Sequence, residues 1–229
     1  MSLNVQYEGS RRTHLRHEMS ANIRRCAYEQ LAAGGAESLS MNAIAKKLGV
    51  SGPALYRYYA SREELLAELV TESWEELAAR MEETAAGASR LSAAERFRAE
   101  AQAYRRWALD SPHRYRLLNG SRFGTGALDP ERIVPAAHRT MIVVLGALVE
   151  VSSPRGLRPP LTPELSAQLL AWATSRRPDS SVPPEVLLRG LLAQTRIHGV
   201  VSLEIEGYFD QLGIDADLLF DHEVDALLA

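Results

Sequence analysis

The sequence has a single cysteine, Cys26, among its 229 residues. One cysteine excludes an intrachain disulfide and a metal site built from several thiolates. No run of about 18 apolar residues occurs, so we expect no membrane-spanning segment. The first ten residues lack the charged and then apolar pattern of a signal peptide. We therefore expect the protein to lie in the cytoplasm, with no membrane partner.

Motifs of catalysis and cofactor binding are missing too. The sequence contains no Gly-x-Ser-x-Gly turn, no phosphate-binding glycine loop and no His, Cys or Asp cluster at metal-ligand spacing. We therefore expect no enzyme, no catalytic residue, no metal and no cofactor. A helical enzyme is the alternative from another class, and a convergent set of polar catalytic groups would distinguish it.

No stretch shows the alternation of a strand and no internal repeat occurs, whereas apolar residues recur at helical spacing along most of the chain. The predicted fold is all-α. Residues 1–12 lack this periodicity and are expected to form a mobile basic arm. The predicted helices cover about 13–33, two short helices within 40–62, then about 61–86, 93–110, a helix from 112, 130–151, 163–176, 184–212 and a last helix capped by Asp215 or Asp217.

Residues 40–62 predict two short helices joined by a tight turn. Ser40 is a plausible N-cap, and Gly49 stands where the first helix needs a left-handed residue to end. Ser51 caps the second helix, and Pro53 lies in its first turn, where a missing N–H costs nothing. The pattern is that of a helix-turn-helix, whose second helix has the size that enters a DNA major groove. The alternative is an ordinary helical corner.

The second helix argues against the ordinary corner. Leu55 and Tyr59 can face inward, which leaves Tyr56 and Arg57 facing outward. An exposed tyrosine beside an arginine suits phosphate binding better than core packing.

Charge is distributed unevenly along the chain. Residues 1–62 hold nine Lys and Arg against four Asp and Glu, a net charge of +5, whereas the remainder carries −8. A basic module beside an acidic body is expected of a protein that binds nucleic acid through one end. The alternative is a chance excess of charge on a solvated surface.

Three linked pieces of sequence resemble the N-terminal domain of the TetR family of transcriptional regulators. They are Ile44-Ala45-Lys46-Lys47-Leu48-Gly49-Val50-Ser51, Leu55-Tyr56-Arg57-Tyr58-Tyr59 and Ser61-Arg62-Glu63-Glu64-Leu65-Leu66. The resemblance covers roughly residues 13–66. Tyr59 stands where phenylalanine is usual, so its buried hydroxyl needs a partner. Arg62 stands where lysine is usual.

The resemblance implies which residues contact double-stranded DNA. Small residues at the start of the second helix would meet base edges, Arg57 could reach a base, and other side chains would contact phosphates. The implied DNA-binding residues are Ser40, Ser51, Gly52, Pro53, Ala54, Tyr56, Arg57, Tyr58 and Arg62.

The resemblance also implies a small-molecule pocket enclosed by the C-terminal helices. The candidate lining residues are Tyr104, Trp107, Tyr115, Phe123, Met141, Leu145, Trp172, Gln194 and His198. For each of them plain core packing is the alternative. Residues 197–209 resemble a subgroup with a Trp-His-Gly signature, in which Ile197 replaces the tryptophan here.

These observations lead to one functional hypothesis. Residues 1–62 would form the arm and DNA-binding domain, and residues 63–229 the helical effector-binding and dimerisation domain. We expect a homodimeric repressor that a small molecule releases from a palindromic operator. The helix predicted at 184–212 and the last helix would pair with their copies, burying Val201 and Leu227. A regulator with a vestigial pocket, controlled by a protein partner, is a further alternative.

Overall fold

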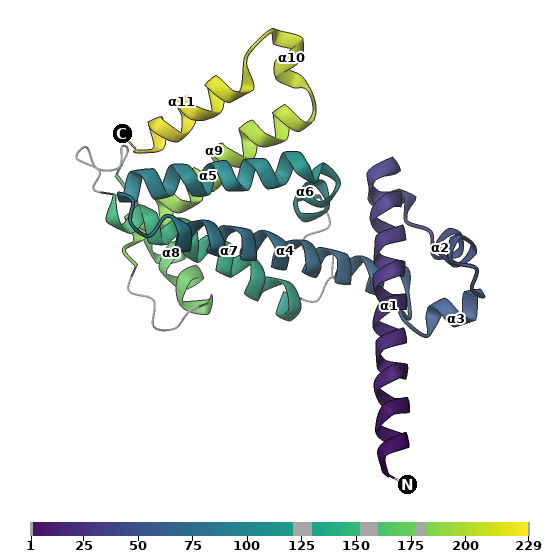
Figure 1. The fold of residues 1–229 in the computed structure, drawn as a ribbon. Helices are drawn as coiled ribbons and strands as arrows, with labels where there is room; N and C mark the ends of the chain where they lie inside the picture. The colour runs from purple at the N-terminus through teal and green to yellow at the C-terminus, as the bar shows by residue number, and fades with distance from the viewer. Residues whose placement is uncertain (1, 121–129, 152–159, 177–181, 229) are drawn as a thin grey trace. The chain divides into compact units, whose positions relative to one another are not determined.

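The structure is a computed structural model that describes residues 2–120, 130–151, 160–176 and 182–228. Within these ranges the ordered elements are helices and no strand occurs, which confirms the predicted all-α class (Figure 1). None of the described helices is long and apolar enough to cross a membrane. In chain order the elements are α1 (Ser2–Gly34), the 3-10 helix η1 (Ala36–Ser38), α2 (Met41–Leu48), α3 (Gly52–Tyr56), α4 (Arg62–Gly87), α5 (Ala93–Asp110), α6 (Pro112–Asn119), α7 (Pro130–Glu150), α8 (Pro163–Arg176), α9 (Pro184–Ile205), α10 (Tyr208–Leu212) and α11 (Ala216–Leu228).

The described chain forms two compact units. The first comprises Met1–Ser73 and Pro112–Ile133, and the second comprises Trp74–Ser111 and Val134–Ala229. Helix α4 is continuous and contributes residues to both units. The separation into a DNA-binding part up to residue 62 and an effector part from residue 63 is a functional division, and it stays a prediction.

Helix α1 begins at Ser2, so the prediction of a mobile arm over residues 1–12 is wrong. Residues 2–12 contain no proline, so each backbone N–H past the first turn can join the helical hydrogen bonding. Residues 2–12 have no apolar periodicity, which explains why the sequence indicated a start near residue 13.

The core of the first unit lies where α1 meets α2, α3 and the start of α4. Its most buried members include Ile23, Ile44, Leu55 and Leu65. Helix α4 starts after a modified capping box, in which Ser61 Oγ accepts from Glu64 N at 3.0 Å. The Glu64 carboxylate accepts from Ala60 N at 2.5 Å, whereas in a regular capping box it would accept from the N-cap residue, Ser61.

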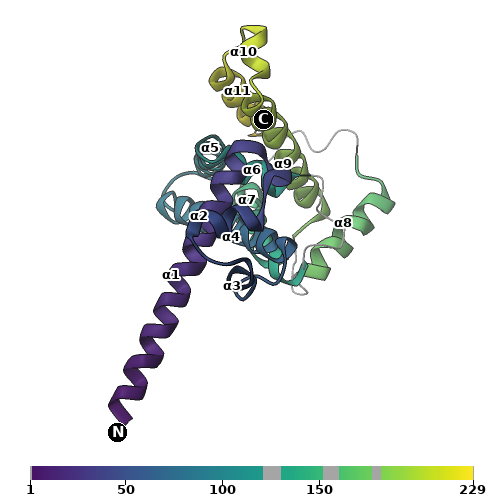
Figure 2. The same ribbon diagram turned by 90° about the vertical axis from the view of Figure 1, so that its right-hand side faces the viewer.

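In the second unit, α9 packs against α5, α8, α10 and α11, and α11 returns along α9 (Figures 1 and 2). The single helix predicted over 184–212 is wrong, because the chain breaks at Gly207 between α9 and α10. Gly207 has φ 70°, a left-handed conformation that glycine adopts at little cost and that ends a helix. Helix α9 thus has 22 residues, and α1, with 33, is the longest of the described helices. Asp215 caps α11 by accepting from Asp217 N and Leu218 N, which resolves the two predicted caps.

The other predicted boundaries agree closely with the structure. The capping box of Ser92 and Glu95 is present at the start of α5, and α5 and α8 have the predicted limits. The sequence also predicts loops over 119–130 and 154–163 and a polar linker over 176–184, and these segments fall largely outside the described residues.

Candidate nucleic-acid interface and effector pocket

Two serines start the helices of the helix-turn-helix, as predicted. Ser40 Oγ accepts from Ala43 N at 3.3 Å, and Ser51 Oγ accepts from Ala54 N at 3.3 Å. Gly49 ends α2 with φ 67°, where a residue with a Cβ would be strained. These local features set the turn that carries α3.

Helix α3 and the turn after it present an inner and an outer face. Leu55 and Tyr59 are buried, whereas Tyr56 is 46% exposed and Arg57 is exposed. The Tyr59 hydroxyl has the partner that its burial requires, because Arg24 Nη1 donates to it at 3.3 Å. Ser40, Ser51 and Pro53 are also exposed, and Gly52, Ala54 and Tyr58 are half-buried. Eight of the nine predicted DNA-binding residues are thus exposed or half-buried in the helix-turn-helix of the first unit.

A hollow of about 740 Å³ joins this surface to α1. Arg57 and Tyr58 line it together with Arg16 and His17, which the sequence analysis did not single out. Among the side chains that the structure describes, from residue 13 onward, two guanidinium groups and no carboxylate line the hollow. Such a concave basic surface attracts phosphate oxygens. The sequence carries little signal for Arg16 and His17, because residues 1–39 hold five Lys and Arg against four Asp and Glu.

Arg62, the ninth predicted DNA-binding residue, forms hydrogen bonds to the backbone within the first unit. Its Nε donates to Leu39 O at 3.0 Å and its Nη2 donates to Ala36 O at 2.5 Å. The guanidinium therefore holds the segment that leads into the Ser40 cap. Its predicted phosphate contact stays a prediction. Lys47 pairs with Glu29, and Lys46 is exposed.

The second unit contains an apolar pocket of about 160 Å³ formed by α7, α8 and the start of α9. Three of the predicted ligand residues, Met141, Leu145 and Trp172, line it. Seven other lining residues were not predicted, and they are His138, Ile142, Gly146, Val149, Ala173, Val182 and Leu187. His138 is the polar side chain of this lining, next to nonpolar walls that suit an apolar ligand.

The remaining ligand candidates do not line this pocket. Tyr104 and Trp107 are buried in α5, where Trp107 Nε1 donates to Glu76 Oε1 at 3.0 Å. Tyr115 is buried in α6, within the first unit. Gln194 and His198 are half-buried on α9, and burial lowers the pKa of His198, which favours its neutral form. Phe123 lies outside the described residues.

Metal binding gains no support from the described residues. Over residues 2–120, 130–151, 160–176 and 182–228, no three His, Cys, Asp or Glu side chains are placed to hold an ion together.

Comparison with known proteins finds the same family for the N-terminal and the C-terminal part of the chain. Residues 23–69 match the family described as bacterial regulatory proteins, tetR family, and residues 97–227 match the tetracyclin repressor-like C-terminal domain. The HTH-type transcriptional regulator Rv1816 of Mycobacterium tuberculosis (strain ATCC 25618 / H37Rv) is 29% identical over 223 residues, which cover 96% of this chain and 94% of the relative.

Solved structures agree with this likeness. The crystal structure of SCO4313, a protein assigned a regulatory role, is 37% identical with a TM-score of 0.76, covering 94% of this chain and 98% of that one. A tetR-family regulatory protein from Rhodococcus RHA1 shares the fold, with 21% identity, a TM-score of 0.57, and coverage of 91% of this chain and 94% of that one.

Proposed function

The chain belongs to the TetR family of bacterial transcriptional regulators, and from this premise we propose that it is a repressor that a small apolar molecule releases from its operator. As a transcriptional regulator of this family it acts on DNA, and members of the family bind operators as dimers. The repressor role, the palindromic operator and the effector belong to the proposal. Since bacterial DNA lies in the cytoplasm, the proposal also places the protein there.

The observation that carries the proposal is the outward Tyr56 and Arg57 on a capped helix-turn-helix. Tyr56 is held near the surface because its neighbour Leu55 is buried in the core of the first unit. A tyrosine hydroxyl in this position can donate to a phosphate oxygen, and the longer Arg57 can reach either a phosphate or a base edge. We propose that Arg16 and His17, which share the basic hollow with Arg57, extend the same contact surface along α1.

Dimerisation is supported by apolar side chains left exposed at the end of the second unit. Leu203, Tyr208, Leu212, Ile214 and Leu218 are each between 44% and 71% exposed, and they lie on α9, on α10, on α11 and in the turn before α11. Exposed apolar side chains on neighbouring helices are typical of a surface that a second protein molecule covers. The pairing is therefore proposed for α9, α10 and α11. Val201 is fully buried within the single chain, so its expected place at the interface is wrong.

The apolar pocket supports a small effector. Its volume of about 160 Å³ is below the range of roughly 300–1,000 Å³ that encloses drug-sized ligands. The proposed effector is accordingly a compact apolar molecule. A regulator controlled by a protein partner would instead show no stabilisation by any small molecule in a thermal-shift screen.

An electrophoretic mobility shift with the DNA that flanks the protein's own coding region tests the function. We expect a discrete complex whose affinity falls steeply with salt, with a log–log slope of about −0.9 for each phosphate neutralised. Binding that does not depend on salt, or no binding to any flanking segment, would contradict the proposal.

A further inference from the structure

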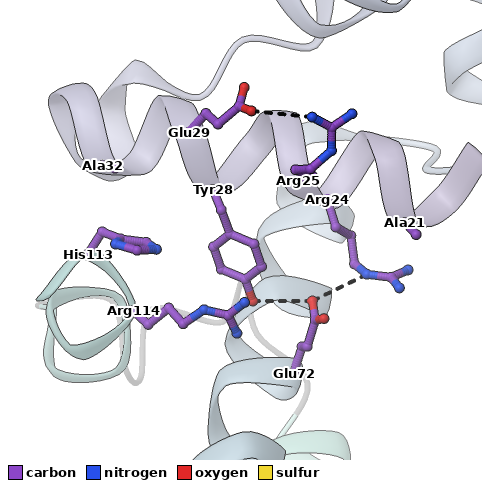
Figure 3. A pocket seen from close by; sticks show the side chains of 9 residues that line it. All are labelled: Ala21, Arg24, Arg25, Tyr28, Glu29, Ala32, Glu72, His113 and Arg114. Carbon is purple, nitrogen blue, oxygen red and sulfur yellow. Dashed lines mark hydrogen bonds and ion pairs between the residues drawn. The ribbon is translucent and has the colours of Figure 1, made fainter. Parts of the chain in front are cut away.

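The first unit contains a second cavity, of about 400 Å³, which shares no lining residue with the basic hollow or the apolar pocket (Figure 3). Helix α1 supplies one wall, and Glu72 of α4 with His113 and Arg114 of α6 supplies the others. The cavity is open to solvent on one side, and its volume is within the range of small-molecule pockets. Nothing in the proposed function uses it.

The cavity exists because α1 has two different faces. Ile23, Ala27 and Leu31 are buried against the helix-turn-helix. At about 100° per residue, Ala21, Tyr28 and Ala32 point to a second face. The two alanines leave room there, whereas a leucine at either position would fill part of the space.

Tyr28 extends from α1 toward α4 and α6, and residues of both helices contact its side chain (Figure 3). Its hydroxyl lies 3.1 Å from Leu69 O, 3.2 Å from Glu72 Oε2 and 3.2 Å from Ser73 Oγ. The Arg114 guanidinium lies 3.8 Å from the centroid of its ring. Burial raises the pKa of the Tyr28 hydroxyl, which therefore stays neutral. Tyr28 forms a rigid wall for the cavity.

The side chains around Tyr28 carry an excess of positive charge. The lining includes three arginines, Arg24, Arg25 and Arg114, and the imidazole of His113, against two carboxylates. Arg24 pairs with Glu72 at 3.2 Å, and Arg25 pairs with Glu29 at 3.6 Å. The second pair is a weak one, because both side chains are largely exposed, at 63% and 44%. Arg25 can therefore exchange Glu29 for another anion at little cost.

We propose that this cavity is a binding site for a small organic anion, which presents a carboxylate or a phosphate to Arg25 and Arg114 and rests its apolar part on Ala21 and Ala32. Guanidinium groups bind both kinds of anion through paired, charge-assisted hydrogen bonds. Arg25 and Arg114 come from different helices, α1 and α6, so an anion bound by both links the two helices once Arg25 turns away from Glu29 toward Arg114 (Figure 3).

Occupation of the cavity would affect DNA binding through Arg24. This arginine lines the cavity and also donates a hydrogen bond to the Tyr59 hydroxyl, which lies just after α3. An anion that attracts the Arg24 guanidinium weakens that hydrogen bond and loosens the support of α3. This part of the inference rests on the proposed function and predicts that the anion lowers operator affinity. By linkage, operator DNA must lower the affinity for the anion by the same factor.

Calorimetric titration of the full-length protein with four probes tests the site. The anions are benzoate and adenosine 5′-monophosphate, and their neutral counterparts are benzamide and adenosine. We expect saturable binding of at least one anion and binding of its neutral counterpart that is about ten- to hundredfold weaker. The two anions separate a carboxylate site from a phosphate site.

Variants then locate the binding. Arg114→Gln and Arg25→Gln should each weaken the bound anion about tenfold or more. Arg116→Gln is the matched control, since Arg116 lies on α6, is exposed and does not line the cavity. The Arg25 side chain is exposed, so we expect Arg25→Gln to fold. This variant therefore tests the site even if Arg114→Gln does not fold. Equal binding of the neutral probes, no saturable binding of either anion, or an equal loss in Arg116→Gln would overturn the site.

Mobility shifts with and without the bound anion test the link to DNA separately. We expect the anion to weaken operator binding of the parent protein and to have less effect on Arg25→Gln. Unchanged operator affinity with the site occupied would overturn the regulatory role of the cavity. A protein that binds the anion but no DNA would contradict the proposed function and leave the site intact.

Discussion

Arg105 of α5 and Glu204 of α9 form a bidentate ion pair, with Nε 2.7 Å from Oε2 and Nη2 2.5 Å from Oε1. The side chains are only 7% and 15% exposed. Arg105 Nη1 also lies 2.6 Å from Asp217 of α11, and the guanidinium lies 5.0 Å from the Phe220 ring centroid. One side chain thus joins three helices of the second unit. Hydrogen bonding to Glu204 raises the pKa of Arg105 above its ordinary value.

Replacing Arg105 by methionine should destabilise the protein by about 3–5 kcal/mol, because Glu204 would stay buried without its partner. Urea unfolding followed by circular dichroism measures the loss. Adding Glu204→Gln to Arg105→Met removes the stranded charge and should recover part of the stability. Arg106→Met is the matched control, since Arg106 is the exposed neighbour on α5. Equal stability of Arg105→Met and the parent would contradict this account of the pair.

Glu100, also on α5, should make stability depend on pH. The residue is 2% exposed, and burial raises the pKa of its carboxyl to about 7, against a smaller opposing effect of Arg96. The unfolded chain releases the proton near pH 4.5, whereas the folded chain keeps it to about pH 7. The free energy of unfolding should therefore fall as pH rises through this window, by about 3 kcal/mol in total.

The variant Glu100→Gln isolates that contribution, since it has the shape of the acid and cannot ionise. We expect it to match the parent near pH 4.5 and to be more stable at pH 8. Thermal melting of both proteins across this range measures the difference. A difference that does not change with pH would show that Glu100 ionises normally in the folded chain.

Helical and capping features of this fold could be predicted because their signals are local. Ser40, Gly49, Ser51 and Pro53 each act within a few residues of their own position, and all four predicted features are in the structure. The break at Gly207 was missed because apolar spacing continues on both sides of it. A glycine within a periodic stretch does not reveal whether the backbone turns there.

The pocket lining and the tertiary partners could not be predicted in the same way. His138 and Val182 meet only because α7 approaches the start of α9. Arg62 resembles a phosphate-binding residue in sequence, yet its hydrogen bonds go to Ala36 and Leu39, more than twenty positions away. Which helix faces meet is decided by packing across the unit, and one sequence does not report it.

Gly190 of α9 offers a way to narrow the apolar pocket. A Cβ at this position would lie 2.5 Å from Leu145 Cδ2, so Gly190→Ala must displace a side chain that lines the pocket. We expect about tenfold weaker binding of a ligand found by thermal-shift screening, as overpacking costs about 1–3 kcal/mol. Stability should change little, because alanine favours a helix over glycine by about 1 kcal/mol.

Gly199→Ala is the matched control for this change. Gly199 lies on the same helix, and a Cβ there meets nothing within 4 Å. Calorimetry should show parental ligand affinity for Gly199→Ala. Parental affinity for Gly190→Ala as well would mean that the ligand binds elsewhere.

Leu218 tests the proposed dimer surface. It is 71% exposed at the start of α11, so Leu218→Asp should leave the single chain folded. In the dimer the same change would bury two uncompensated charges, which is costly. Sedimentation velocity should show a monomer with normal helix content and no operator complex. Leu91→Asp, at a 46% exposed position outside α9, α10 and α11, should stay dimeric. A dimeric Leu218→Asp would place the interface on another surface.

Tyr56 and Arg57 should affect DNA binding in different ways, although they are neighbours. Tyr56→Phe removes a hydroxyl that can donate to a phosphate, so it should weaken operator and unrelated DNA alike, each by about 0.5–1.5 kcal/mol. Arg57→Ala, if the guanidinium reaches a base, removes a contact worth about 1–3 kcal/mol at the operator and less elsewhere. Fluorescence anisotropy compares the affinities for operator and for unrelated DNA, at a fixed salt concentration, and so separates the two effects.

Tyr58→Phe tests the second tyrosine predicted to bind DNA, which is half-buried and lines the basic hollow. Equal losses on both DNAs for Arg57→Ala would make Arg57 a phosphate contact, and base reading would then fall to the small residues Gly52, Pro53 and Ala54 at the start of α3.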